Sequence, residues 1–312
     1  MILHRVAAPG GRCHTPRPVR VLHISDVHVD VPLAQVPWGD WLGKRFLAGL
    51  VFLLHRRQTF RDVRAKLASL VHFCEEQAVD LVICTGDHTA FGTEPELAEA
   101  RVALAPLMAR PAGFVHVPGN HDLYLPSALR ERRFERHFGD TLASDLPEHA
   151  VDGPWPLVRL VGDHLAVVAV NSARPNPQVW RSSGAIPDLQ LRALAKALAD
   201  PRVRERFVFV ATHYAPRLPD GRPDRPLHGL ENADDFLAAC RGVERGAILH
   251  GHLHRRFRLD RTAEPPIFCA GSTTQEEREG LWLFDVGADG AVARSGSFDG
   301  SGYVLDGPAK PV

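Results

Sequence analysis

The sequence predicts a layered α/β fold. Short apolar runs typical of buried strands alternate with stretches whose apolar residues recur at helical spacing. Strands that alternate with helices in this way build sheets covered by helices, because each element must bury its apolar face against another layer. The first alternation is strand, helix, strand, helix, strand, over residues 19–24, 60–78, 80–85, 94–108 and 114–117.

The rest of the chain continues the alternation without an internal repeat or an interdomain linker. We therefore predict one domain over residues 19–305, between a flexible leader (1–18) and a short tail (306–312). Asp188 is placed to cap a helix over 189–199, and Gly162-Asp163 marks a turn between two strands. The other predicted strands are 157–160, 165–170, 207–211, 246–249, 266–270 and 281–286, and the other helices are 126–138 and 232–240.

Composition and charge exclude some classes of protein. The 312 residues are 45% hydrophobic and 24% charged, as in ordinary globular proteins. The net charge is zero, so no overall field attracts nucleic acid or an acidic membrane. The 5 cysteines are scattered, without a Cys-x-x-Cys pair, which indicates free thiols in a reducing compartment. The N-terminal stretch has no apolar core of signal-peptide length, so we expect a cytoplasmic protein.

An apolar insertion at about 38–58 interrupts the pattern. Its residues 46–54 are almost entirely apolar and are flanked by Lys44-Arg45 and His55-Arg56-Arg57. The run is far shorter than the roughly 20 apolar residues that cross a bilayer. An interfacial helix that contacts the inner face of a membrane, a pocket lid, a self-association surface and a helix packed on its own domain all remain open.

Polar side chains follow the predicted strands at the points where these end. Ligand sites of α/β sheets lie outside the carboxyl ends of the strands, so these side chains are expected to meet at one edge. Each block alone is explained by a turn or a buried structural histidine, but five in succession indicate a shared metal site. The blocks are Asp26 and His28, Asp87, Asn120 and His121, His213, and His252 and His254.

This donor set indicates the kind of metal. Imidazole and carboxylate without thiolate suit divalent ions such as manganese, iron or zinc. The candidate side chains exceed the needs of one tetrahedral ion and match two ions that share a bridging carboxylate. Two ions about 3.5–4 Å apart hold a bridging hydroxide at neutral pH and clamp oxygens during an in-line displacement at phosphorus.

In their order these blocks resemble the calcineurin-like metallophosphoesterase superfamily. The matching blocks are Asp26-x-His28, Gly86-Asp87, Gly119-Asn120-His121-Asp122, His213 and Gly251-His252-x-His254, within residues 19–270. The resemblance implies a four-layer α/β/β/α sandwich with a dinuclear site at one edge. It also implies two divalent or trivalent metal ions as cofactors, with manganese, iron or zinc the foremost candidates.

The same resemblance implies a role for each matched residue. His121 would face the substrate, and Asp122 would hold its imidazole in the useful tautomer. No tyrosine stands beside Asp87, which sets the chain apart from the purple acid phosphatase branch with its tyrosine ligand. The implied ligands are Asp26, His28 and His254 for one metal, Asn120, His213 and His252 for the other, and Asp87 as the bridge.

Similarity to the bacterial class III cyclic nucleotide phosphodiesterase group makes phosphodiester hydrolysis the expected activity. His121 would assist attack by the bridging hydroxide, because a diester's poor leaving group benefits from a proton donor. His88, Asn171 and Arg174 are candidate substrate contacts, although a buried His88 and a solvated Arg174 are equally ordinary. The alternatives are a hydrolase of lipid-linked pyrophosphates or phosphodiesters, a nuclease and a catalytically silent metal-binding scaffold.

Overall fold

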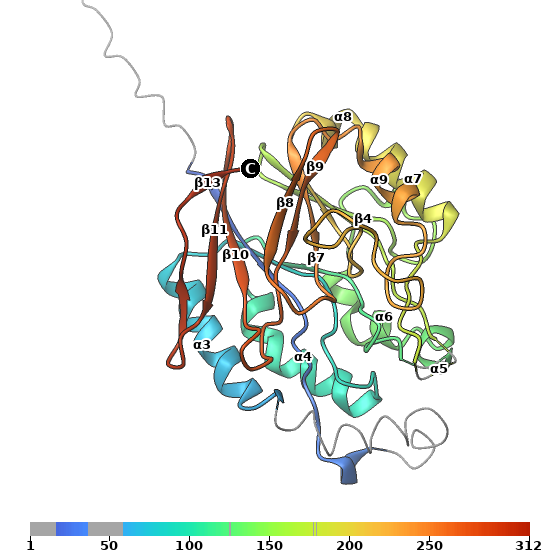
Figure 1. Ribbon diagram of the computed structural model, residues 1–312, viewed down its shortest axis with the longest axis vertical. Coiled ribbons are helices and arrows are strands. Elements are labelled where there is room, and N and C mark those ends of the chain that lie inside the picture. The colour runs from blue at the N-terminus through green and yellow to red at the C-terminus, as the bar shows by residue number, and fades with distance from the viewer. Residues whose placement is uncertain (1–16, 37–58, 125, 177, 179) are drawn as a thin grey trace, which may run out of the picture.

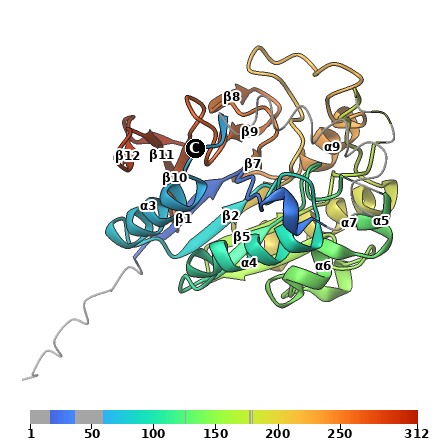
Figure 2. The same ribbon diagram turned by 90° about the horizontal axis from the view of Figure 1, so that it is seen from below.

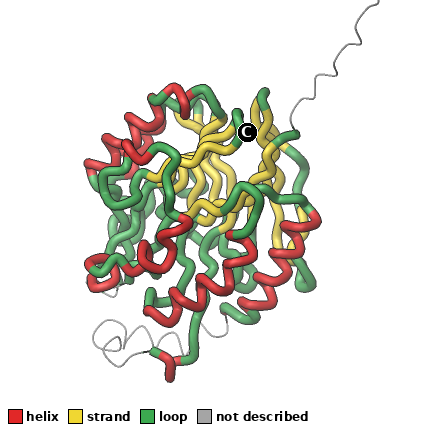
Figure 3. Tube along the Cα trace, turned by 180° about the vertical axis from the view of Figure 1, so that it is seen from behind, coloured by secondary structure: helices red, strands yellow, loops and turns green. Residues whose placement is uncertain are grey.

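The structure is a computed structural model that describes residues 17–36, 59–124, 126–176, 178 and 180–312. Two β-sheets lie between outer helices, so the predicted four-layer α/β/β/α sandwich is confirmed (Figures 1 and 3). The site described below lies at the carboxyl ends of the parallel strands.

The first sheet carries three of the polar blocks. Its parallel strands β1, β2 and β3 are aligned in register, with Ile24 opposite Cys84 and Cys84 opposite His116. The chain therefore leaves all three strands at one edge. The sheet has 7 strands, in the order β12 (Tyr303–Leu305), β11 (Gly290–Phe298), β10 (Leu281–Gly287), β1 (Val19–Ile24), β2 (Leu81–Cys84) and β3 (Phe114–His116), with β13 (Lys310–Pro311) paired to β11.

The second sheet carries the other two blocks. Its strands β5, β6, β7 and β9 are parallel, and β6 and β7 lead into the loops of His213 and His252. The order of its 6 strands is β4 (Leu157–Val161), β5 (Leu165–Ala169), β6 (Phe207–Ala211), β7 (Gly246–His250), β9 (Glu264–Cys269) and β8 (Phe257–Arg261).

Aromatic side chains join the sheets. The ring of Phe284 in β10 lies 4.8 Å from that of Phe209 in β6 and 5.1 Å from that of Phe268 in β9. All three rings are fully buried. Burial of such large apolar surfaces is the main favourable term that holds the two sheets together.

Helices cover the outer faces, as Figure 2 shows from below. The helix α4 starts with a capping box, in which Thr93 and Glu96 satisfy each other's backbone N–H groups. The amphipathic pattern places Leu67 and Leu70 of α3 in the core. The α-helices of the described residues are α3 (Val63–Glu76), α4 (Glu94–Met108), α5 (Pro126–Arg130), α6 (Arg133–Phe138), α7 (Asp188–Ala199), α8 (Pro201–Arg204) and α9 (Ala233–Cys240).

Several local expectations are corrected. The predicted helix 126–138 breaks into α5 and α6 at Arg132, which has a left-handed backbone (φ 48°). Asp188 is the first residue of α7 and Pro187 precedes it as the cap. Residues 306–312 are more than a tail, since β13 pairs with β11. Arg17, assigned to the leader, donates a hydrogen bond to Asp80.

The predictions about the flexible leader and about membrane contact fall largely on residues that the structure does not describe. Residues 1–16 and the whole insertion at 38–58 lie outside the described residues. Among the residues that are described, no helix is both long enough and apolar enough to cross a membrane.

Candidate metal centre

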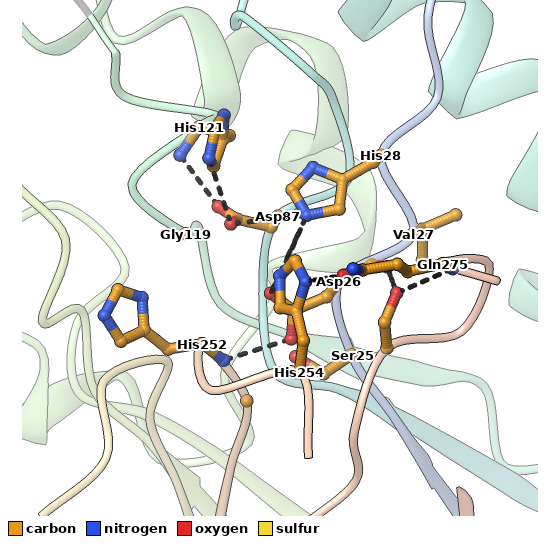
Figure 4. Close-up of polar contacts among 12 residues, drawn as sticks. Ser25, Asp26, Val27, His28, Asp87, Gly119, His121, His252, His254 and Gln275 are labelled. Carbon is orange, nitrogen blue, oxygen red and sulfur yellow. Dashed lines mark hydrogen bonds and ion pairs between the residues drawn. The ribbon is translucent and has the colours of Figure 1, made fainter. Parts of the chain in front are cut away.

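The structure brings together every residue that the sequence marked as a metal ligand. The five loops after β1, β2, β3, β6 and β7 converge at one edge of the sandwich, where the two sheets meet. Figure 4 shows His28, His254, Asp26 and Asp87 turned toward one another. Strands of both sheets thus contribute to a single cluster.

The backbone at this cluster is held in an uncommon conformation. Asp26, His28, Asp87, His252 and His254 all have positive φ, between 47° and 69°. Such left-handed residues cost free energy unless the surrounding structure enforces them, and they concentrate at functional sites. Their occurrence at five of the predicted ligands indicates that the loops are shaped for the position of these side chains.

Two glycines let the loops approach. A Cβ at Gly119 would lie 2.1 Å from Oδ1 of Asp87, and one at Gly251 would lie 1.8 Å from Oγ of Ser25. Any larger residue would displace Asp87 or Asp26 from the cluster. This explains why Gly precedes Asn120 and His252 in the sequence.

Three side chains form a first group. Nε2 of His254 lies 3.0 Å from Oδ1 of Asp26 and 3.2 Å from Nε2 of His28. Nδ1 of His28 faces the carbonyl oxygen of Thr89 at 3.3 Å, and Nδ1 of His254 hydrogen-bonds to Oε1 of Gln275. Because these oxygens can only accept hydrogen bonds, the Nδ1 atom of each ring carries the proton. Both Nε2 atoms therefore present lone pairs to each other and to Asp26.

Three more side chains form a second group. Nδ1 of His213 donates to the carbonyl of Thr85 (2.7 Å), and Nε2 of His252 donates to the carbonyl of His228 (3.0 Å). Their other nitrogens lie 2.9 Å and 3.1 Å from Oδ1 of Asn120. An acceptor oxygen therefore faces two nitrogen lone pairs with no proton between them.

Asp87 lies between the two groups. Its Oδ2 is 3.8 Å from Nε2 of His28 and 3.6 Å from Nε2 of His213. Its Oδ1 accepts the backbone N–H of His121 at 2.7 Å, which fixes the carboxylate plane. Asp26 is oriented in the same way, since its Oδ2 accepts the N–H of His252 at 3.0 Å.

These residues fit divalent metal ions. Oδ1 of Asp26 is buried and accepts no hydrogen bond from the described residues. Burial lowers the pKa of His213 and of His252, so both imidazoles are neutral and able to coordinate. A cation in each group would satisfy the converging acceptors, and the second nitrogen of each histidine is already held as in metal proteins.

His121 stands beside the cluster and is oriented by a backbone carbonyl. Its Nδ1 donates to the carbonyl oxygen of Ala90 at 2.7 Å. Its Nε2 lies 4.0 Å from Oδ2 of Asp87. The ring is therefore held with Nε2 toward the centre of the site, where a substrate would lie.

The predicted role of Asp122 is wrong. Its oxygens accept hydrogen bonds from the backbone N–H groups of His88, Thr89 and Gly119, from Oγ1 of Thr89 and from Nδ1 of His88. It is completely buried and ties the loop after β3 to the loop after β2.

His88 is not a substrate contact either. It is completely buried, its Nδ1 donates to Asp122 (2.9 Å), and its Nε2 lies 3.0 Å from Nδ1 of His116. Burial opposes a charge on His88, but Cys84 and Asp122 raise its pKa to about 10. Nε2 of His116 lies 2.8 Å from Oγ1 of Thr141, whose hydroxyl donates to the carbonyl of Phe138. His88, His116 and Asp122, called here the buried histidine network, are thus satisfied by protons.

Of the other two candidate substrate contacts, Arg174 lines a cavity beside the cluster and Asn171 does not. Asn171 is 6% exposed, and its Oδ1 accepts the backbone N–H of Ala173, so it shapes the loop after β5 and does not line the site. Arg174 lines a small cavity together with Asn120 and His121.

An open cavity of about 400 Å³ lies over the cluster. Sequence reasoning missed Gln275, which orients His254, and His228, which donates a hydrogen bond to Asp224 and whose ring lies 4.4 Å from that of His252. Both stand in loops without a strand-end motif, so no sequence signal indicated them. The lining residues are Asp87, Asn120, His121, Ser182, His228, His252, Leu253, His254, Gln275 and Arg278.

A four-layer sandwich with this ligand set at its strand ends defines the class of metallophosphoesterases. A family model of the calcineurin-like phosphoesterases matches residues 19–256. The chain belongs to this family, which typically binds two metal ions. The recognition from the sequence blocks is therefore confirmed.

Solved structures share the fold. A dimetal phosphatase from Danio rerio superposes with a TM-score of 0.60 at 16% identity, over 94% of this chain and 99% of its own. A purple acid phosphatase from yellow lupin gives 0.58 at 9% identity, over 93% and 54%. GAP50 of Plasmodium gives 0.52 at 10% identity, over 95% and 89%. No curated protein matches the sequence.

Proposed function

We propose that this protein is a dinuclear metal-dependent phosphodiesterase. The observation that carries the proposal is the convergence of nitrogen lone pairs and oxygens from five strand ends, with His121 held beside them. In the proposal, Asp26, His28 and His254 hold one ion, Asn120, His213 and His252 hold the other, and Asp87 holds both. Such ions, when bound, supply a nucleophile at neutral pH and bind the phosphoryl oxygens.

His121 would act on the leaving group. Since Nδ1 is held by the carbonyl of Ala90, Nε2 is the atom that can hold a proton toward the cavity. Donation of this proton to the leaving oxygen would assist breakage of the bond between phosphorus and oxygen. Nε2 lies 4.0 Å from Oδ2 of Asp87, so a proton on this nitrogen would be held at the edge of the cluster.

The shape of the site supports a diester over a monoester. The 400 Å³ cavity over the cluster and a second cavity of about 160 Å³ share Asn120, His121 and Ser182. The two cavities therefore adjoin at these residues, so room exists beyond the main cavity for the second substituent of a diester.

The test is hydrolysis of two diesters, bis(4-nitrophenyl) phosphate and diphenyl phosphate, and of the matching monoesters, 4-nitrophenyl phosphate and phenyl phosphate, by protein loaded with manganese, iron or zinc. We expect higher kcat/KM for the diesters. His121→Ala should retain metal but lose about 10²–10⁴-fold in kcat for the diester with the poorer leaving group. His72→Ala, at an exposed position of α3, is the control. Equal turnover by His121→Ala would remove this residue from the mechanism.

A lipid-linked substrate is the second candidate, and the apolar, base-flanked residues 46–54 favour it. Against it, Leu253 is the sole apolar side chain among the described residues that line the main cavity. Deletion of 46–54 should abolish co-sedimentation with liposomes of anionic lipid if this segment contacts membranes. Failure of the intact protein to sediment at low salt would contradict the membrane contact.

A cytoplasmic location is proposed on the state of the cysteines. Cys74, Cys84, Cys240 and Cys269 are free and buried, as expected of thiols kept reduced. Cys13 lies outside the described residues.

A further inference from the structure

We infer that the 160 Å³ cavity beside His121 binds an anionic group, phosphate or carboxylate, carried by the leaving group of the substrate. The inference rests on the proposed hydrolase function and adds a substrate class to it. The cavity is lined by Asn120, His121, Tyr124, Arg174, Asn176, Arg181 and Ser182. It is therefore continuous with the cluster on the side where His121 would protonate the leaving oxygen.

The charges of this cavity are unbalanced in favour of an anion. Arg174 and Arg181 both form ion pairs with Oε1 of Glu231. Desolvation opposes ionisation of Glu231, but hydrogen bonds from the two arginines and Ser183 lower its pKa to about 2. Two guanidinium groups thus share one carboxylate, which leaves one positive charge over.

Donors remain for a ligand. Nε and Nη2 of Arg174 donate to the carbonyl and Oγ of Ser183, and Nε of Arg181 donates to the same Oγ at 2.9 Å. The Nη1 group of each arginine makes no hydrogen bond with another described residue. Guanidinium groups bind phosphate and carboxylate with charge-assisted hydrogen bonds, for which these groups are available.

Hydrogen bonds join the three segments around the arginines, residues 174–176, 181–184 and 227–231, which form the wall of the cavity. Ser182 donates its N–H to the carbonyl of Leu227, and Glu231 donates its N–H to the carbonyl of Gly184. Asn176 is 6% exposed and donates from Nδ2 to the carbonyl of Ser183 at 2.9 Å. Three chain segments are thereby locked together, so little ordering entropy is lost when an anion binds.

This wall is also connected to the metal cluster through packed aromatic rings. A Cβ at Gly184 would lie 2.2 Å from the ring of Tyr214, so the wall packs directly on that ring. The ring of Tyr214 lies 4.3 Å from that of His252 and 5.3 Å from that of His213. The residues that follow Arg181 are therefore connected to the cluster through the packed ring of Tyr214.

The cavity suits a group of limited size. Its volume is about 160 Å³, and a water molecule occupies about 30 Å³ in the liquid. A phosphate or carboxylate fits there together with its first linking atoms. The ring of Tyr124 lies nearly parallel to that of His121, with centroids 5.9 Å apart, and forms an apolar surface for those atoms.

The reaction then has a defined outcome. A water oxygen bonds to phosphorus, the bond from phosphorus to the leaving oxygen breaks, and that oxygen receives a proton. The products are a phosphate monoester and an alcohol that keeps its own phosphate or carboxylate. The arginines contact the alcohol part, so they discriminate between substrates by the charge of the leaving group.

The experiment compares three methyl aryl phosphodiesters that differ only in the leaving group. The leaving groups are 2-nitrophenols with a carboxylate, a phosphonate or an uncharged carboxamide at position 4. For the metal-loaded wild type we expect kcat/KM to be about tenfold or more higher for at least one anionic probe than for the carboxamide, as charge-assisted hydrogen bonds imply. The better of the two anionic probes identifies the group that the cavity takes.

The variants test which residues cause this preference. In Arg174→Gln and Arg181→Gln the ratio of kcat/KM between the anionic and carboxamide probes should fall toward one, mainly through KM. Arg174→Lys should keep part of the ratio, because it keeps the charge and loses the planar fork. Arg64→Gln is the matched control, an exposed arginine of α3 paired with Glu99, and should keep the wild-type ratio.

Each outcome is decisive. Hydrolysis of all three probes at equal kcat/KM by the wild type overturns the anion site but leaves the proposed function intact. Equal losses on all probes in both Arg174 variants mean that Arg174 is structural, which also overturns it. If the wild type hydrolyses none of the probes, the proposed function fails and the anion site with it. Circular dichroism of Arg174→Gln is compared with that of Arg174→Lys, and the lysine variant decides if the glutamine variant is unfolded.

Discussion

Two clusters of histidine and carboxylate lie side by side on the same loops, yet they are different kinds of site. In the metal cluster, Nε2 of His213 faces Oδ1 of Asn120 at 2.9 Å and Oδ2 of Asp87 at 3.6 Å, with no proton between them. In the buried histidine network, Nδ1 of His88 donates to Asp122 at 2.9 Å and each nitrogen has a partner of the opposite kind.

The difference lies in the hydrogen bonds and not in the residue types. Each histidine of the metal cluster gives its proton to an outside acceptor, such as the carbonyl of Thr85 or Oε1 of Gln275. The nitrogens that face inward then lack protons, and a cation must supply the positive charge. In the network the proton on His88 supplies it. A count of donors and acceptors therefore separates a metal site from a structural cluster.

The largest effect is expected from Asp87→Ala. This change removes the carboxylate between the two groups, so purified protein should hold neither ion and turnover should fall by far more than a hundredfold, beyond the loss typical of residues that only orient a ligand. Inductively coupled plasma mass spectrometry and diester hydrolysis provide the readouts. After a chelator has removed all metal, the free energy of unfolding should differ from that of the wild type by only about 1 kcal/mol. The variant loses one hydrogen bond to His121, but the repulsion between the Asp87 carboxylate and the other acceptors of the cluster is relieved.

Asp163→Ala, in the exposed turn between β4 and β5, is the matched control for that variant. Two ions still bound to Asp87→Ala would contradict the bridging role.

Asp122→Asn should show the opposite pattern. The free energy of unfolding of the chelated protein should fall by roughly 3–5 kcal/mol, because the buried partner of His88 loses its charge and several N–H donors lose an acceptor. Urea unfolding of the chelated variant and wild type measures it. An unchanged midpoint would contradict this structural role of Asp122. Loss of metal without loss of stability would place Asp122 in the metal cluster instead.

A smaller effect is expected from Gln275→Ala. Without its oxygen, Nδ1 of His254 is no longer held as the donor, and the tautomer that presents Nε2 to Asp26 becomes less populated. The affinity for one of the two ions should fall by about 10–100-fold, measured by competition with a chelator. Gln275→Glu, which restores the acceptor, should recover most of it, and an equal loss in both variants would contradict this explanation.

The last prediction concerns pH. The pKa of His88 is raised above its unfolded value to about 10, so its contribution to stability is complete below about pH 6.5 and is lost as pH rises toward 10. Stability of the chelated wild type should fall between pH 7 and pH 10 by up to about 1.4 kcal/mol per pH unit. His88→Gln should show a flatter profile, and parallel profiles of the two proteins would mean that His88 is neutral.

Much of the fold was predictable because its strands are short, apolar and separated by clear helices. The helix at 94–108 agrees with α4 to the residue, and the strands at 19–24 and 207–211 agree with β1 and β6. The strands β8 and β11 were missed, since Arg258, Asp260 and Arg294 interrupt their apolar pattern. Both are partly exposed strands, where alternation is weak and neighbours decide the structure.

The sequence by itself determined the family, the strand-end blocks and the set of residues that meet at the site. It did so because ligands at the ends of parallel strands must converge, whatever the loops do. Tertiary structure alone decided which neighbour orients each imidazole. Ala90 is one residue from Thr89 and Asp122 one residue from His121, yet His121 bonds to Ala90, and Asp122 bonds to His88 and Thr89. A hydrogen bond depends on where a side chain points, and that follows from packing between loops far apart in the sequence.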